Sequence, residues 1–240
     1  MGLTRSIHGQ QRSTEAFDEE GGGQEPQREA AGEEGKASGH HPLMDAASWD
    51  ERYGTDGLLW TAQPNRFFVA EVVDLPPGRA LDMACGEGRN AVWLATKGWQ
   101  VTAVDHSEVG LAKGRDLALE AGVEVDWRLG DATTYDPAPG FDLVAVLYLH
   151  LPRDQMRTAL EKAMRGLEPG GLMVVVGHHL DNIVRGVGGP QVPEVLYRPQ
   201  DIEQMLGGLD IVKAETVERP VDRAGVTGIA IDTLVTAVRP

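Results

Sequence analysis

The chain has 240 residues with a formal net charge of -15, and 41% of its residues are hydrophobic. These values fit one α/β domain of ordinary size with a tail, and they argue against a general nucleic-acid binder, because an acidic surface repels phosphate groups. The single cysteine, Cys85, excludes an intrachain disulfide and a cysteine-based zinc cluster, and no apolar run is long enough for a membrane span or a signal peptide, so we expect a cytoplasmic protein without a membrane partner.

The first segment differs in character from the rest of the chain. Residues 1–42 are rich in Gly, Glu and Gln and show almost no apolar periodicity. We expect them to form a disordered tail, with a regulatory or interaction arm as the alternative. A folded domain is expected over residues 43–240. Its opening part, residues 43–78, predicts a helical lead-in that a Pro-Pro-Gly turn brings to an end.

After this lead-in, strand-like and helix-like segments alternate. Short apolar runs typical of strands cover residues 80–84, 101–104, 123–129, 141–147 and 172–176. Helical patterns lie between them at residues 89–97, 107–121 and 152–165, the second with Ser107 as its N-cap and Gly122 as its stop. Strands that alternate with helices at this spacing predict a parallel sheet with right-handed crossovers.

The last part of the chain follows a different pattern. A helix is predicted over residues 198–206, followed by strands over 211–217 and 229–238. The connection between these two strands is too short for a crossover helix, so we expect them to pair antiparallel. The sequence therefore predicts a Rossmann-like, doubly wound α/β fold with helices on both faces of the sheet.

The strongest chemical signal is the sequence Asp-Met-Ala-Cys-Gly-Glu-Gly-Arg-Asn at residues 82–90, where the first strand turns into the first helix. Ligands of open α/β sheets bind at the carboxyl ends of the strands. Small residues let a ligand approach the backbone, and the free N–H groups of the following helix suit an anion. A methionine carboxylate and a pyrophosphate would fit this turn equally well.

Two further acids end the next two strands, namely Asp105 and Asp131, and the second is followed by Ala132. A carboxylate at the first position can accept hydrogen bonds from ribose hydroxyls, and one at the second from an adenine amine. Each acid taken alone is explained as well by a turn or a helix cap. Three such signals at neighbouring strand ends favour a single adenosyl-type ligand.

The order of residues 82–88, Asp105 and Asp131-Ala132 resembles motifs I, II and III of class I S-adenosylmethionine-dependent methyltransferases. More closely, Trp-Asp-Glu-Arg-Tyr at 49–53 and Cys-Gly-Glu-Gly-Arg-Asn-Ala at 85–91 are similar to the tellurite-resistance type, which lies near the thiopurine methyltransferases. The resemblance extends from the first of these strings to the C-terminus. One departure is Ala84, which replaces the first glycine of the usual turn.

This resemblance implies S-adenosylmethionine as the cofactor and a seven-stranded sheet of order 3-2-1-4-5-7-6 with strand seven antiparallel. It implies that the methionine part lies at the glycine turn, the ribose at Asp105 and the adenine beside His106 and Asp131. The carbonyl of Leu147 would accept from the cofactor's amino group. The cofactor-binding residues that it implies are Asp82, Ala84, Gly86, Gly88, Asp105, His106, Asp131, Ala132 and Leu147.

A methyltransferase needs a general base only where the accepting atom must lose a proton. His150, just past the fourth strand, is our choice of catalytic residue, because histidine suits proton removal near neutral pH. We expect Tyr148, His178 and Trp60 to contact the substrate. Since His178 and His179 are adjacent in a strand and so point to opposite faces, we expect no metal site.

The loop at residues 147–152 lacks the Asn/Asp-Pro-Pro-Tyr/Phe string of enzymes that methylate nucleic-acid bases or glutamine. With the acidic charge, this favours in-line methyl transfer to a small-molecule acceptor. Two alternatives stay open. Gly-x-Gly-x-x-Ala at 86–91 is typical of an NAD-dependent oxidoreductase, although Asp82 inside the preceding strand argues against one. A non-catalytic S-adenosylmethionine-binding protein would keep the same fold.

Overall fold

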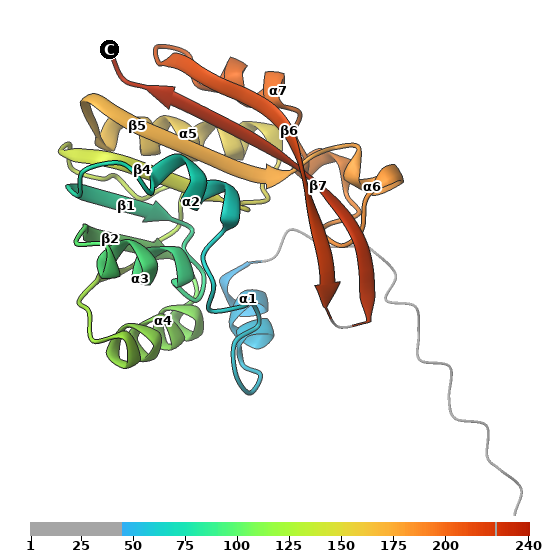
Figure 1. Ribbon diagram of the computed structural model, residues 1–240, viewed down its shortest axis with the longest axis horizontal. Helices are drawn as coiled ribbons and strands as arrows, with labels where there is room; N and C mark the ends of the chain where they lie inside the picture. The colour runs from blue at the N-terminus through green and yellow to red at the C-terminus, as the bar shows by residue number, and fades with distance from the viewer. Residues whose placement is uncertain (1–44, 224) are drawn as a thin grey trace, which may run out of the picture. The chain divides into compact units, whose positions relative to one another are not determined.

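The computed structural model describes residues 45–223 and 225–240, and their centre is one sheet with the strand order β3-β2-β1-β4-β5-β7-β6 (Figure 1). Strands β1 to β5 pair in parallel, whereas β7 pairs antiparallel with both β5 and β6. This confirms the predicted fold class and strand order. The predicted tail, residues 1–42, lies outside the described part of the chain.

Buried apolar runs form the strands in the middle of the sheet. Both β1 and β4 are almost wholly buried, as expected of parallel strands with helices on both faces. The strands are β1 (Arg79–Met83), β2 (Gln100–Asp105), β3 (Asp126–Leu129), β4 (Phe141–Leu147), β5 (Leu167–His178), β6 (Asp210–Arg223) and β7 (Val226–Val238).

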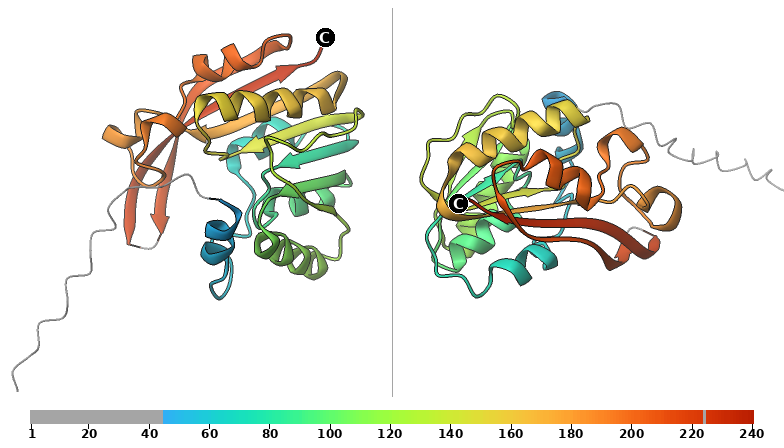
Figure 2. Two further views of the ribbon diagram at one scale, coloured as in Figure 1. Left: turned by 180° about the vertical axis from the view of Figure 1, so that it is seen from behind. Right: turned by 90° about the horizontal axis from the view of Figure 1, so that it is seen from above.

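Helices cover both faces of this sheet (Figure 2). One hydrophobic cluster joins the sheet to α2, α3 and α4, and a second joins it to α5 and α7. The helices are α1 (Ala46–Tyr53), α2 (Arg66–Val72), α3 (Arg89–Thr96), α4 (Glu108–Ala121), α5 (Arg153–Gly166), α6 (Asn182–Arg185) and α7 (Pro199–Met205), with a short 3-10 turn at Pro193–Val195. Among the described residues, we find no helix with the length and apolarity that crossing a bilayer requires.

The predicted caps of α4 are confirmed in detail. The Ser107 side chain accepts a hydrogen bond from the Gly110 N–H, and Gly122 ends the helix with a left-handed φ of 67°. Further along the chain, Pro152 is the N-cap of α5 rather than its first helical residue. Helix starts at the carboxyl edge of the sheet are thus fixed by local sequence.

Several boundaries differ from the prediction for physical reasons. The third strand begins later than expected, because the Val123 N–H still bonds to the Ala118 carbonyl at the end of α4. The fifth strand starts before its expected Pro-Gly-Gly turn, which the sheet accommodates by a register shift opposite Phe141–Leu143. The short helix α6 was not predicted, since its four residues are too few to show a helical period.

The final hairpin is much longer than predicted. Pairing between β5 and β7 starts only at Asp232, whereas β6 and β7 stay paired back to Arg223 and Val226. The outer half of the hairpin therefore extends past the sheet (Figure 1). Mixed polar and apolar residues with Pro220 concealed this segment in the sequence, yet a proline is compatible with an edge strand.

Candidate active site

The turn after β1 forms the first half of the candidate site. Ala84, Gly86 and Gly88 all have positive φ values, of 63°, 57° and 75°, so the backbone reverses within a few residues. Ala84 keeps the turn in spite of its methyl group, at the cost of a conformation that favours glycine. A Cβ atom on Gly86 would lie 2.7 Å from the Tyr53 hydroxyl, so only glycine allows this approach of the lead-in.

Asp82 lies directly below this turn and is completely buried. Neither of its carboxylate oxygens has a hydrogen-bond partner among the residues that the structure describes. Burial first, and then the charge of Asp105, raise the pKa of Asp82 to about 7, and the backbone dipole at Ala91 and the charge of Arg89 oppose this only in part. A buried acid without a donor suits a site that receives a cationic group from a ligand.

Asp105 connects the turn to α4. Its carboxylate accepts hydrogen bonds from the Gly86 N–H at 2.8 Å and from the Ser107 N–H at 2.9 Å. Burial raises the pKa of Asp105, although both N–H groups act in the opposite direction. Each oxygen of a carboxylate has two lone pairs, so one on each remains for a ribose hydroxyl. The structure places Asp105 at the turn, and its role in binding ribose stays a prediction.

Asp131 and Ala132 follow β3. The Asp131 carboxylate is exposed and accepts hydrogen bonds from the N–H and the hydroxyl of Thr133, each at 2.6 Å. These bonds form a local turn, which is the alternative explanation that the sequence offers for this acid. Ala132 is buried in the core. His106, directly after β2, is half-buried. Their contacts with adenine stay predictions.

The lead-in is anchored over the turn by buried charge. The Glu87 carboxylate accepts hydrogen bonds from the Leu59 N–H at 2.8 Å and from the Trp60 N–H at 2.9 Å. The Asp50 carboxylate of α1 accepts from the Ser107 hydroxyl at 2.5 Å. The structure thus places the lead-in, with Trp60, against the glycine turn.

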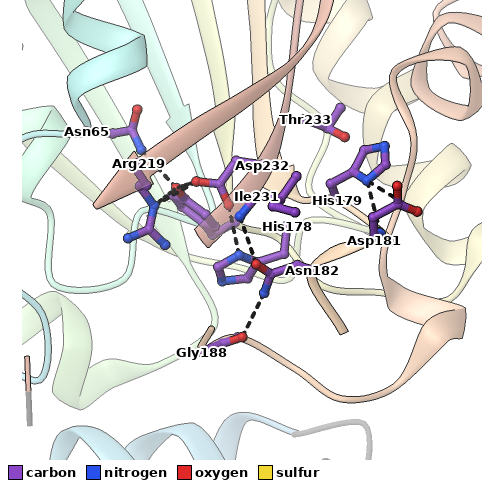
Figure 3. Close-up of polar contacts among 12 residues, drawn as sticks. Asn65, His178, His179, Asp181, Asn182, Gly188, Arg219, Ile231, Asp232 and Thr233 are labelled. Atoms are coloured by element: carbon purple, nitrogen blue, oxygen red, sulfur yellow. Dashed lines mark hydrogen bonds and ion pairs between the residues drawn. The ribbon is translucent and has the colours of Figure 1, made fainter. Parts of the chain in front are cut away.

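The second half of the site is a hydrogen-bonded cluster around Asp232, a fully buried residue of β7 (Figure 3). One of its oxygens contacts His178 Nδ1 at 2.8 Å. The other accepts from the Tyr148 hydroxyl at 2.8 Å and from Arg219 Nε at 2.7 Å. Burial alone would raise the pKa of Asp232, but the hydrogen bonds from His178 and Tyr148 and the positive charge of Arg219 outweigh it and hold the pKa below its usual range.

Sheet register explains how these residues meet. His178 and Asp232 are directly opposite in the β5–β7 pair, and Asp232 is opposite Val217 in the β6–β7 pair. Opposite residues share a face of the sheet, and so does Arg219, two residues beyond Val217. The cluster is therefore a consequence of strand pairing between segments distant in sequence.

Tyr148, just past β4, has a left-handed φ of 57°, which is rare outside glycine and costs about 1–3 kcal/mol. Burial and the charge of Asp232 raise the pKa of the Tyr148 hydroxyl, so it stays a hydrogen-bond donor. That hydroxyl also accepts from the Asn65 side chain at 3.2 Å. The strained residue thus connects α2 to the cluster.

The two expected histidines also meet here. The rings of His150 and His178 stack with centroids 5.3 Å apart and an angle of 6° between planes. His179 takes another direction, since its Nδ1 accepts from the Asp181 N–H at 3.0 Å. Within the described ranges, no group of three or more potential ligands could hold a metal ion.

Sequence reasoning missed Asp232 and Arg219. An available signal was the lone acid Asp232 inside the otherwise apolar or small run at 229–238, where a charge needs a buried partner. Nothing local marks Arg219, which lies on an exposed, mixed-polarity strand. The structure brings Tyr148, His150 and His178 together as expected.

Comparison with known proteins finds a methyltransferase domain in the middle of the chain. Residues 80–171 match a family model described as a methyltransferase domain. The chain is 30% identical over 135 residues to a ubiquinone biosynthesis O-methyltransferase of Xylella fastidiosa, and this alignment covers 54% of each of the two chains. It is 25% identical over 112 residues to a probable S-adenosyl-L-methionine-dependent methyltransferase, TehB, of Haemophilus influenzae, covering 44% of this chain and 39% of TehB. The match thus spans about half or less of these curated relatives.

Solved structures share the fold. A structure from a study of the conversion of a disulfide bond into a thioacetal group during echinomycin biosynthesis has a TM-score of 0.65 at 21% identity, covering 81% of this chain and 89% of its own. TehB from Haemophilus influenzae has a TM-score of 0.62 at 15% identity, covering 81% and 67%. These likenesses concern the fold. Together with the matched domain, they confirm the predicted resemblance to class I methyltransferases near the tellurite-resistance group.

Proposed function

Because the chain carries a class I S-adenosylmethionine-dependent methyltransferase domain, we propose that it transfers the sulfonium methyl group of S-adenosylmethionine to a small-molecule acceptor. The observation that carries this proposal is the buried Asp82 carboxylate, which has no hydrogen-bond donor among the described residues. The methionine part of the cofactor has an ammonium group, and this group would supply the missing donor and charge.

The cofactor, when bound, supplies an already activated methyl group, so the protein's task is to position the reactants and exclude water. The N–H groups at the start of α3 would hold the methionine carboxylate. Asp105 would accept from the ribose, His106 and Asp131 would lie beside the adenine, and the Leu147 carbonyl would accept from the amino group. Tyr53, which is buried against Gly86, would keep water away from the turn.

The same observation argues against the oxidoreductase alternative. A dinucleotide would bring its negatively charged pyrophosphate to the turn at 84–88, directly above a buried acid. Two neighbouring negative groups repel each other strongly in a region of low dielectric constant. A non-catalytic binding protein would show cofactor binding without turnover across an acceptor panel.

A small acceptor and a cytoplasmic location complete the proposal. The acidic charge of -15 disfavours nucleic acids as acceptors. The relative from Xylella fastidiosa is itself named as an O-methyltransferase of ubiquinone biosynthesis, which supports a small acceptor here. The one cysteine is free and buried, so the protein requires no oxidising compartment.

Isothermal titration calorimetry with S-adenosylmethionine, S-adenosylhomocysteine and NAD tests the proposal. We expect both adenosyl compounds to bind and NAD to produce no heat. Asp82→Asn should weaken their binding about tenfold to a hundredfold, the scale of a hydrogen bond to a charged group. Asp154→Asn, which changes an exposed acid on α5, is the matched control. NAD binding without a response to S-adenosylmethionine would overturn the proposal.

A further inference from the structure

The cluster around Asp232 carries an inference about the acceptor, and this inference rests on the proposed function. We propose that the acceptor is a hydroxy acid, with His178 as the general base for its hydroxyl and Arg219 as the ligand for its anionic group. Both residues bind the carboxylate of Asp232, and each keeps hydrogen-bonding capacity that no described residue uses.

His178 is oriented as a base. An ionised Asp232 can only accept a hydrogen bond, so the contact at 2.8 Å places the proton of the neutral ring on Nδ1. The lone pair is then on Nε2, at the opposite edge of the ring. That edge faces the loop at Gly189, where an added Cβ would lie 2.7 Å from Nε2. A side chain at this position would collide with the ring, so glycine is what allows the loop to lie this close to the buried base.

A base of this kind indicates which atom is methylated. A neutral amine attacks before it loses a proton, and a thiol with a pKa of about 8.5 ionises readily near neutral pH. An aromatic hydroxyl with a pKa of about 10 stays protonated and benefits most from proton removal during attack. The orientation of His178 therefore favours a hydroxyl oxygen as the nucleophile.

Arg219 is oriented to bind an anion. Its hydrogen bonds to Asp232 and Tyr148 are made by Nε alone, and its guanidinium lies over the Tyr148 ring at 5.7 Å. No described residue accepts from its two terminal amino groups. Those groups point away from Asp232 (Figure 3). Its side chain is 26% exposed, so a ligand can reach it. A guanidinium with two parallel donors matches a carboxylate in a bidentate arrangement.

The chemical step is balanced by these groups and the proposed methyl donor. As the hydroxyl proton passes to His178 Nε2, the hydroxyl oxygen forms a bond to the methyl carbon. The electron pair of the breaking carbon–sulfur bond stays on the donor's sulfur, which becomes a neutral thioether. The imidazolium, stabilised by Asp232, later releases its proton to water.

A panel of aromatic and aliphatic hydroxy acids, each paired with its methyl ester, tests this inference. Transfer of a labelled methyl group should be at least about tenfold faster to the acid of a pair than to its ester. Calorimetry on protein saturated with S-adenosylhomocysteine should show binding of the acid and much weaker binding of the ester. In Arg219→Met this preference should disappear, whereas Arg185→Gln, which changes an exposed arginine of α6, should keep it.

His178→Gln should lower turnover by about a hundredfold or more while leaving the dissociation constant of S-adenosylhomocysteine nearly unchanged. His179→Gln is the matched control, since its ring lies at the same strand end but bonds to Asp181. If the His178 variant does not fold, nitrogen-15 NMR of the native protein still reports whether Nδ1 carries the proton and whether adding the acid perturbs Nε2.

The outcomes distinguish this inference from the proposed function. Failure of S-adenosylhomocysteine to bind would refute the methyltransferase proposal itself. Cofactor binding together with equal use of acids and esters, or no binding of any acid, would overturn the hydroxy-acid inference alone. Turnover of His178→Gln within twofold of the native rate, or a ring with its proton on Nε2, would remove His178 as the base.

Discussion

Replacing Asp82 with asparagine should stabilise the ligand-free protein at alkaline pH while it weakens cofactor binding. Burial and the neighbouring Asp105 raise the pKa of Asp82 from 3.8 to about 7. A carboxyl whose pKa is raised on folding binds its proton more tightly in the folded state, so its contribution to stability falls as pH rises from 3.8 to about 7. Above that window the charge costs roughly 4 kcal/mol.

Asparagine removes this cost, but its buried amide lacks hydrogen-bond partners, and this destabilises the fold by about 1–3 kcal/mol. We therefore expect Asp82→Asn to raise the free energy of unfolding by about 1–3 kcal/mol at pH 8. The advantage over the native protein should shrink continuously as pH falls towards 4. Urea unfolding followed by tryptophan fluorescence at several pH values measures this difference, with Asp154→Asn as the exposed control.

A ligand that brings an ammonium group should make the native protein, rather than Asp82→Asn, the more stable of the two. Saturating S-adenosylhomocysteine should stabilise the native protein more than Asp82→Asn, because only the native carboxylate gains a partner. A variant that is less stable at pH 8, or a difference that does not change with pH, would refute the account of Asp82 as an uncompensated buried charge.

Three further substitutions test other parts of the site. Asp232→Asn should cost about 3 kcal/mol of stability, since it leaves Arg219 without its counter-ion, and should shift the His178 proton in nitrogen-15 NMR; an unchanged tautomer would contradict its positioning role. Ala84→Gly should stabilise the fold by about 0.5–1 kcal/mol in urea unfolding, because φ is 63° there, and a loss would show that the methyl group packs usefully. Glu87→Gln should speed hydrogen exchange at the Trp60 amide, and unchanged protection would mean that other contacts hold the lead-in.

Local sequence patterns predicted the fold well because each pattern determines the helix or strand in which it lies. The apolar run of β4 keeps its predicted bounds, and Ser107 and Gly122 cap α4 as expected. The antiparallel end of the sheet followed from a connection too short for a helix. Where a residue's neighbours in sequence determine its structure, the sequence was sufficient.

The cluster around Asp232 depends on contacts between distant segments, and the sequence alone did not predict it. His150 was favoured because it directly follows β4, whereas the geometry favours His178, which Asp232 of another strand orients from 54 positions away. Likewise, the acid Asp82 was expected at the turn, but its missing donor is visible only once its surroundings are in place. Strand register, rather than local composition, selects the residues that meet.

The most direct test of the central claim is a crystal structure of the protein with S-adenosylhomocysteine. We predict the ligand's ammonium group against Asp82, its ribose hydroxyls at Asp105, and its sulfur directed towards the cluster of His178 and Asp232. A ligand bound elsewhere, or one whose ammonium group avoids Asp82, would contradict the account.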